Sequence, residues 1–249
     1  MTITILDKAV APWLPTDIAG CVSWYAADLI TGLSDTDPVG TWPDENGNAY
    51  PLTQAVGASK PIYYIDQING KPALYGDGTD DVIVNTAFSS AFTGEDLPYT
   101  FLYVARIMIH TDWRALGGIG RTGADSFYSA LGTSGIDVTK YRFSKYNGAN
   151  EGYQDTATST ANTNWNSWEV SSSGVAITVI RNAITLIDAQ AQDIPSITVN
   201  AFSLFALWRN GAISLPLRCY IAEMVVCSAE ISSADRTNWR TYVNGKYGL

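Results

Sequence analysis

Carboxylate side chains are the first residues in this sequence that could carry out chemistry. An enzyme that cleaves glycosidic bonds with retention needs an acid and a nucleophile about 5 Å apart. Two carboxylates at alternating positions of one strand would lie on the same face and meet that requirement. Glu223 is the nearest to a candidate, but no glutamate has an aspartate two positions further on, and the glutamates are Glu45, Glu95, Glu151, Glu169, Glu223 and Glu230.

The sequence gives little support for a catalytic triad in which a histidine activates a serine nucleophile. His110 is the single histidine, and the sequence contains no Gly-x-Ser-x-Gly turn that would raise a serine nucleophile. His110 follows an apolar run and stands beside Thr111 and Asp112. We expect it to be a loop residue with an ordinary hydrogen bond. Together with the glutamate pattern, this predicts that the chain is not an enzyme.

Two groups of polar residues offer the oxygen ligands that calcium prefers. Asp44, Asn46 and Asn48 alternate along one loop, although Ala49 stands where an EF-hand has glycine and no glutamate follows in register. Asp77, Asp80 and Asp81 form the second group. Asx side chains next to glycine also form turns. We therefore keep a weak calcium prediction at these places beside the favoured interpretation of a turn, and predict no other cofactor.

Aromatic residues form the strongest functional signal, because 12% of the chain is Phe, Trp or Tyr. Sugar rings stack their C–H faces on aromatic rings while nearby polar side chains bind the hydroxyls. Trp24, Trp208 and Trp239 are expected in the core. Tyr153 lies among the aromatic residues of the central part of the chain. The candidate carbohydrate-binding residues lie in the central, loop-rich part of the chain and are Trp113, Arg114, Tyr128, Tyr141, Tyr146, Trp165 and Trp168. Simple packing in the core is the alternative for any of them.

Charge and hydropathy limit the partners. The formal net charge is −9, with 15 Lys and Arg that form no cluster, so nucleic acid is not expected as a partner. No apolar run is long enough to insert into a membrane, and the sequence shows no secretory signal. Hydrophobic residues make up 46% and charged residues 16%, which is enough apolar material for one compact domain.

The three cysteines are predicted to be reduced. Cys21, Cys219 and Cys227 have no metal-type spacing. Cys219 and Cys227 fall in one extended segment, where eight residues at about 3.3 Å each separate them by roughly 26 Å, too far for a disulfide.

Short runs rich in β-branched and aromatic residues, bounded by turn residues, predict about a dozen strands without helices between them. Turns are expected at Arg181-Asn182, Asn69-Gly70 and Asn147-Gly148, and a long exposed loop over residues 148–164. The expected strands are 22–26, 73–75, 81–85, 99–107, 115–118, 127–131, 136–143, 167–172, 175–181, 183–187, 202–208 and 217–226.

One helix is predicted at the carboxyl end. Ser232 and Asp235 have the spacing of a capping box, and Gly248 is placed to end the helix. The apolar face, which we expect to cover an end of the sandwich, consists of Trp239, Tyr242, Val243 and Tyr247. Residues 1–20 are expected to form an amino-terminal arm and residues 21–249 a single domain.

Three segments resemble the concanavalin A-like lectin/glucanase superfamily, specifically LamG-like jelly rolls of the kind found in tailed-phage proteins. Residues 22–54 contain a W-x-D-x-x-G-N loop, and residues 60–84 contain N-G-x-P-x-L followed by Asp-Gly and Asp-Asp. Residues 219–249 contain an I-A-E-x-x-V strand, a capped helix start and a final K-Y-G. The resemblance implies an all-β, two-sheet antiparallel sandwich with a short C-terminal helix, and implies that Glu223 belongs to a structural strand.

The resemblance also implies two functions. The first is a phage virion protein, made in the host cytoplasm, that serves as a structural or decoration module of capsid or tail and contacts other virion proteins, with a homotrimer as one arrangement. The second is a free carbohydrate-binding module that binds surface glycans. A glycoside hydrolase is the third and least favoured reading.

Overall fold

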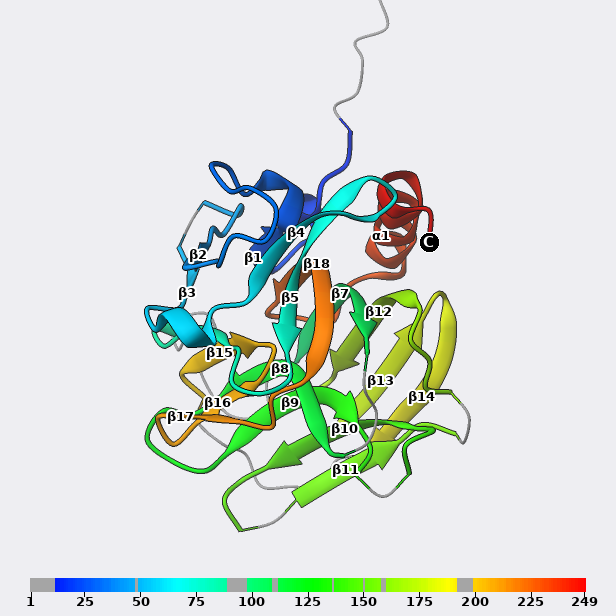
Figure 1. The fold of residues 1–249 in the computed structure, drawn as a ribbon. Helices are drawn as coiled ribbons and strands as arrows, with labels where there is room; N and C mark the ends of the chain where they lie inside the picture. Colours follow the sequence, from blue (N-terminus) through cyan, green and yellow to red (C-terminus); the bar gives the residue numbers. More distant parts are fainter. Residues whose placement is uncertain are drawn as a thin grey trace, which may run out of the picture.

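A computed structural model shows two antiparallel sheets packed face to face, with one helix near the C-terminus (Figure 1). This confirms the predicted all-β sandwich. The structure describes residues 12–47, 49–88, 98–108, 112–135, 137–149, 151–157, 160–191 and 199–249, without the side chains of residues 128–130 and 151. The division into an arm over residues 1–20 and a domain from residue 21 stays a prediction.

Sheet A has the strand order β14-β13-β12-β7-β18-β5-β4, and β1 pairs with the second half of β18. Strands from the beginning of the chain (β1, β4 and β5) and from its end (β18) lie in this sheet beside strands from its middle (β7, β12, β13 and β14). Its strands are β1 (Cys21–Ala26), β4 (Ile62–Ile68), β5 (Lys71–Asp77), β7 (Tyr99–Ile107), β12 (Trp165–Ser172), β13 (Ala176–Arg181), β14 (Ile184–Ala191) and β18 (Arg218–Cys227).

Sheet B has the order β11-β10-β9-β8-β15-β6-β3-β2. Its strands are β2 (Thr41–Trp42), β3 (Leu52–Thr53), β6 (Ile83–Asn85), β8 (Arg114–Gly120), β9 (Phe127–Thr133), β10 (Tyr141–Tyr146), β11 (Glu151–Asp155) and β15 (Ala201–Leu204). A small hairpin joins β16 (Leu207–Arg209) to β17 (Ala212–Ser214), and helix α1 spans Ser233–Tyr247. The fold also contains three 3-10 turns, η1 (Pro15–Asp17), η2 (Ala27–Leu29) and η3 (Gly57–Ser59).

Strand β7 shows why sheet A has two apolar faces. Side chains alternate between the faces of a strand, and Phe101 and Tyr103 pack into the core between the sheets. Leu102 and Val104 face outward and pack with Trp239 of α1 in a second apolar cluster. A strand with apolar side chains on both faces is buried on both sides, and here helix α1 buries the second side over Leu102 and Val104.

The predicted helix signals are confirmed. Ser232 caps α1 by accepting a hydrogen bond from the Asp235 N–H at 3.0 Å. Gly248 ends the helix with φ 75°, a left-handed conformation that glycine adopts without strain. The expectation that the helix covers an end of the sandwich is wrong, because Trp239 and Val243 pack on the outer face of sheet A.

Glu223 lies beneath the helix and is fully buried. The register of β18 against β7 shifts between Ile221 and Glu223, and this irregularity turns Glu223 outward toward α1. Its carboxylate accepts four hydrogen bonds there. The donors are Trp24 Nε1 at 2.6 Å, the Tyr242 hydroxyl at 2.8 Å, Lys246 Nζ at 3.1 Å and the Tyr247 hydroxyl at 2.5 Å.

Glu169 makes a second buried connection between sheet A and the helix. Arg240 donates to both of its oxygens, at 2.6 Å and 3.1 Å, and Arg236 donates at 3.0 Å. Arg236 also donates to the Ser171 hydroxyl at 3.0 Å. The implied structural position of Glu223 is therefore confirmed, and Glu169 has the same role.

The remaining differences from the sequence prediction concern local pairing. The Asn69-Gly70 turn is confirmed, whereas the turn expected at Arg181-Asn182 falls one residue later, where Asn182 and Ala183 both have positive φ. The expected loop over residues 148–164 contains β11, which pairs with β10. The sequence prediction also missed β2, β3, β4 and β17, and the strand expected over residues 136–143 is β10 (Tyr141–Tyr146). Trp208, expected in the core, is half-buried. No helix in the described parts of the chain is long and apolar enough to cross a membrane.

Substitution of Glu223 by alanine tests the buried carboxylate. Glu223→Ala leaves Lys246 and the buried donors of Trp24 and Tyr247 without their shared acceptor, and removal of one partner of a buried ion pair costs about 3–5 kcal/mol. We expect urea denaturation to show a loss of that order. Glu230→Ala, at an exposed position before the helix, is the matched control and should change stability by less than about 0.5 kcal/mol. Equal effects of the two substitutions would contradict this account.

Candidate functional site

The predicted carbohydrate-binding residues do not form one surface. Trp113 and Tyr146 come together on sheet B, where both rings contact Phe127, at centroid distances of 5.7 Å and 5.8 Å. Arg114 begins β8 and forms an ion pair with Asp112 at 3.6 Å. Tyr128 lies on β9, but its side chain is outside the described residues.

Tyr141 and Trp168 belong to the core between the sheets. Their rings meet edge to face at 4.7 Å, and both residues are fully buried. The prediction that they present a ring to a sugar is wrong in this structure, because alternation along β10 and β12 turns them inward. Tyr153, at 45% exposure, carries the guanidinium of Arg142 over its ring at 3.7 Å.

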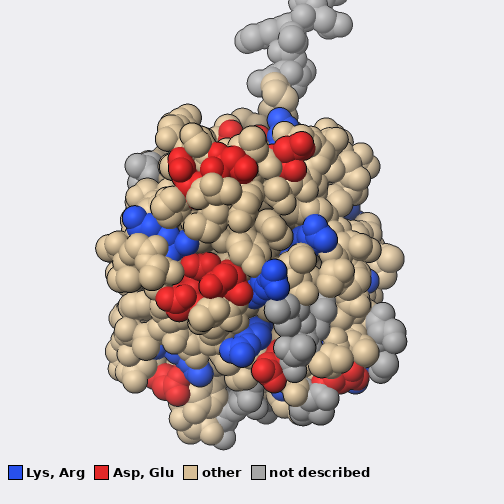
Figure 2. Space-filling model, viewed as in Figure 1, with Lys and Arg blue, Asp and Glu red and all other residues tan. Residues whose placement is uncertain are grey.

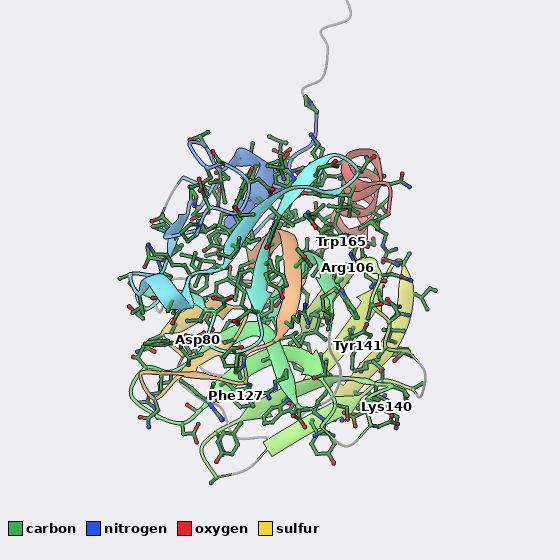
Figure 3. The ribbon with its side chains drawn as sticks, viewed as in Figure 1. Asp80, Arg106, Phe127, Lys140, Tyr141 and Trp165 are labelled. Atoms are coloured by element: carbon green, nitrogen blue, oxygen red, sulfur yellow. The ribbon has the colours of Figure 1, made fainter. Side chains whose placement is uncertain are left out.

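Trp165 occupies a different place, on the outer face of sheet A. Cross-strand pairing puts four residues in one row there. Tyr75 of β5 lies opposite Tyr220 of β18, Tyr220 lies opposite Arg106 of β7, and Arg106 lies opposite Trp165 of β12. Figure 3 shows Trp165 and Arg106 close together on this sheet. We call Tyr75, Tyr220, Arg106 and Trp165, with Tyr64 of β4 beside them, the aromatic row.

The rings of the aromatic row contact one another. Tyr220 is central, with ring centroids 4.8 Å from Tyr75, 6.1 Å from Tyr64 and 6.1 Å from Trp165. Tyr64 meets Tyr75 at 5.9 Å. Every member is half-buried. The rings are held in place by their neighbours and still keep part of their surface in contact with solvent.

Two arginines border these rings. Arg106 donates from Nε to the Thr163 carbonyl at 2.9 Å, and Arg218 donates from Nε to the Tyr75 hydroxyl at 2.7 Å. Within the described residues, neither arginine has an acidic partner. Each guanidinium is therefore oriented by one hydrogen bond through Nε and keeps its terminal nitrogens available to a ligand.

Tyr220, at the centre of the row, remains a protonated donor at neutral pH. Burial raises the pKa of Tyr220, the neighbouring Tyr75 and Tyr64 raise it further, and Arg106 and Arg218 act in the opposite direction. A surface that combines ring faces, phenol O–H groups and guanidinium groups can stack on an apolar face and donate hydrogen bonds to oxygen atoms around it.

Acidic residues stand at the β5 end of the row. Asp77 lies opposite Arg218 in the sheet, and the carboxylate oxygens of Asp77, Asp80 and Asp81 lie within 4.8 Å of one another. Figure 2 shows acidic side chains gathered in the middle of this face with basic side chains beside them. Oxygen ligands at this spacing could hold a divalent cation, which is the second calcium position considered from the sequence.

The first calcium position has a different role in this structure. Asp44 is buried, and its carboxylate accepts the backbone N–H groups of Trp24 at 3.0 Å, Asn46 at 3.0 Å and Tyr50 at 3.1 Å. Asn46 donates to the carbonyls of Cys21 and Val22. These two side chains organise the loop next to β1, as the favoured interpretation of a turn predicts, and the weak calcium prediction stays a prediction for them. Asn48 and His110 lie outside the described residues.

A separate cavity of about 560 Å³ lies between the first described residues and α1. Trp13, Trp24 and Tyr242 supply its aromatic surface. Its charged groups are paired with one another, because Asp28 lies 2.8 Å from Lys246 and 3.9 Å from Lys71. The aromatic row is the better candidate, since its arginines have no such partner among the described residues.

Comparison with solved structures shows a shared fold. No protein-family model and no curated protein matches the sequence. Trypanosoma rangeli sialidase in complex with the inhibitor DANA matches 92% of this chain and 34% of its own, with a TM-score of 0.58 and 13% identity. Domain 4 of AbnA, a GH43 extracellular arabinanase from Geobacillus stearothermophilus, in complex with arabinotriose, matches 90% of this chain and 99% of its own, at 0.59 and 14%.

The binding domain of botulinum neurotoxin DC in complex with SialylT matches 90% of this chain and 51% of its own, with a TM-score of 0.59 and 8% identity. The chain thus spans about a third of the sialidase and about half of the toxin domain. At these identities the likeness shows the fold alone. The chain has a β-sandwich fold that also occurs in carbohydrate-binding and glycan-acting proteins.

The comparison corrects one prediction from the sequence. The prediction that the chain is not an enzyme is wrong, because the chain shares its fold with sialidases and with a domain of an arabinanase. Absence of a familiar carboxylate spacing is therefore no basis for excluding glycosidase chemistry.

Sequence reasoning identified only Trp165 in the aromatic row. Tyr64, Tyr75 and Tyr220 lie in strands in which aromatic and apolar residues alternate, and the sequence alone does not say which alternate residues face outward. Arg106, within the largely apolar strand β7, could have shown which face of that strand is the outer one, because a charged side chain in such a strand must point away from the core.

The acidic residues next to the row predict a pH dependence of stability. Asp81 is only 4% exposed, and burial, with the neighbouring carboxylates, raises its pKa to about 7. The folded state therefore holds this proton more tightly than the unfolded state, and the stability from Asp81 is lost as the pH rises from about 4 through 7.

Urea denaturation across this pH range checks the dependence. Asp81→Asn keeps an acceptor for the Asp77 N–H, which lies 2.8 Å from the Asp81 carboxylate. We expect this variant to gain stability relative to wild type as the pH rises, by a few kcal/mol in total. Asp188→Asn, on the exposed side of β14, should give a difference that does not vary with pH. The account fails if the Asp81 difference is equally flat.

Proposed function

We propose that this chain is a glycan-binding module that binds an oligosaccharide across the outer face of sheet A, along the aromatic row. The observation that carries this proposal is the cross-strand alignment of Tyr75, Tyr220, Arg106 and Trp165. Ring faces stack on the C–H faces of sugars, and few convergent polar groups then fix the orientation.

The dimensions of the row favour an extended ligand. Neighbouring strands lie about 4.8 Å apart, so β5, β18, β7 and β12 spread the row over about 14 Å. An aromatic ring stands at each end, with Tyr75 on β5 and Trp165 on β12. A chain of several sugars would contact both ends, whereas one monosaccharide would contact only part of the row.

The two arginines favour glycans with acidic groups. Guanidinium groups bind carboxylates through two parallel hydrogen bonds. Arg106 lies opposite Tyr220 on β7, and Arg218 lies two residues before it on β18. The net charge of the protein is −9, and Asp77 lies opposite Arg218, so an acidic group of a ligand would bind here through direct hydrogen bonds to the guanidinium groups and not through a net positive charge of the surface. The solved structures of the same fold in complex with arabinotriose and with SialylT support a saccharide as ligand.

A role on a phage particle is a separate proposal. It rests on the sequence resemblance to LamG-like jelly rolls of tailed phages, and it includes attachment to other virion proteins, with a homotrimer as one arrangement. A free lectin is the alternative. Mass spectrometry of purified particles distinguishes them, because a virion protein must be found in the particles at a stoichiometry consistent with a structural copy number.

The Trp165→Ala variant tests the aromatic row. A glycan array at micromolar protein with calcium supplied would first identify bound oligosaccharides. Removal of the indole should weaken binding of the best of them at least about tenfold, or about 1.4 kcal/mol, because tryptophan is among the residues that contribute most at binding interfaces. Tyr153→Ala, on β11 of sheet B, is the matched control and should bind as wild type does. Equal loss in both variants, or no binder on the array, would refute the site.

The Arg218→Gln variant tests the preference for acidic sugars. Wild type should bind a carboxylated oligosaccharide more tightly than the same oligosaccharide with its carboxylates reduced to alcohols, and salt should weaken this difference. In Arg218→Gln, affinity for the acidic form should fall several-fold while affinity for the reduced form changes little. Isothermal titration calorimetry measures both, and equal wild-type affinity for the two oligosaccharides would contradict the role given to the arginines.

A further inference from the structure

Two cysteines at opposite ends of the sequence face each other in sheet A. Cys21 is the first residue of β1, and Cys227 is the last residue of β18. The two residues are direct partners in the antiparallel pairing of these strands. Cys219 and Cys227 lie at opposite ends of β18 and are too far apart to bridge, whereas strand pairing brings Cys21 next to Cys227.

Their side chains share one environment. Cys227 belongs to the apolar cluster beneath α1, and Cys21 packs against the same cluster. The Cys21 thiol donates to the Ser23 carbonyl at 3.8 Å, and the neighbouring Cys21, together with burial, raises the pKa of Cys227. Cys21 is half-buried and reaches solvent, whereas Cys227 is buried. A reagent in solution would therefore meet Cys21 first.

The backbone geometry suits a covalent bond between them. Residues directly opposite each other in an antiparallel pair have Cα atoms about 4.5–5.5 Å apart. A disulfide requires a Cα separation of about 4.4–6.8 Å and side chains that point the same way. Direct pairing places Cys21 and Cys227 within this range, and both side chains lie at the same apolar cluster, next to the register shift between Cys21 and Ser23.

We propose that Cys21 and Cys227 are a redox-sensitive pair that forms an intramolecular disulfide with a small disulfide oxidant such as oxidised glutathione. The Cys21 thiolate attacks one glutathione sulfur, and one glutathione leaves as a thiolate. The Cys227 thiolate then attacks the Cys21 sulfur and releases the second glutathione. One S–S bond forms in the protein and one breaks in the oxidant, and the two thiol protons pass to the two glutathiones.

The bond would connect the two ends of the domain. Among the described strands β1 pairs only with β18, so the beginning of the domain depends on that pairing. A disulfide between Cys21 and Cys227 closes a loop that contains nearly the whole domain, and disulfides that close long loops restrict the unfolded chain most. The oxidised protein would resist unfolding from its amino-terminal strand.

Treatment of the native full-length chain with oxidised glutathione tests this proposal. Two of the three thiols should be lost per chain, and peptide mapping should find the peptides of Cys21 and Cys227 linked while Cys219 stays free. Thermal unfolding should shift upward by about 5–10 °C. Dithiothreitol should restore the thiols and the original Tm.

Variants separate the pair from general oxidation. Cys21→Ala should lose the linked peptides and the rise in Tm, while Cys219→Ala, at the other end of β18, should keep both. A stable glutathione adduct on Cys21 without the link would overturn the proposal. So would thiols that react only after the protein is unfolded, or a link that leaves Tm unchanged.

Discussion

Two buried carboxylates determine which part of sheet A is open to a ligand. Glu169 and Glu223 lie on β12 and β18 in an otherwise apolar surface, and an ionised carboxylate in such a place is stable only when its oxygens are paired. Most of the partners come from α1: Arg236 and Arg240 for Glu169, and Tyr242, Lys246 and Tyr247 for Glu223. The helix can satisfy both carboxylates in only one position. It covers part of the outer face of sheet A and leaves the aromatic row uncovered.

The row itself is a consequence of strand register. Tyr75, Tyr220, Arg106 and Trp165 come from four strands that are distant in sequence, and a shift of one residue in any strand would turn its side chain into the core. The core residues on either side, such as Ile221 and Ala105, fix that register because they must face inward. The surface is thus as rigid as the sheet that carries it. Function in this fold depends on such sites, since the same sandwich occurs in a sialidase, an arabinanase domain and a toxin binding domain.

Features that depend on residues close in sequence were predictable, whereas features that depend on contacts between distant strands were not. The helix was predictable in detail because its signals, Ser232, Asp235 and Gly248, act within a few residues of one another. The sandwich was predictable from strand patterns and from motifs at both ends of the domain. The aromatic row and the Cys21–Cys227 contact were not, since both depend on which strands become neighbours. Tyr141 and Trp168 were misplaced for the same reason: alternation shows that half of a strand faces inward, but not which half.

The central claim is that saccharide binds at the aromatic row, and the indole N–H signals of the tryptophans in NMR spectra test it most directly. The chain has eight tryptophans, and the Trp165 indole donates to the Gln67 carbonyl at 3.1 Å, which places a reporter inside the row. Titration with a bound oligosaccharide should shift the Trp165 signal and leave that of Trp113, on sheet B, in place. A shift of Trp113 or of Trp13 and Trp24 at the separate cavity, with Trp165 unchanged, would contradict the account.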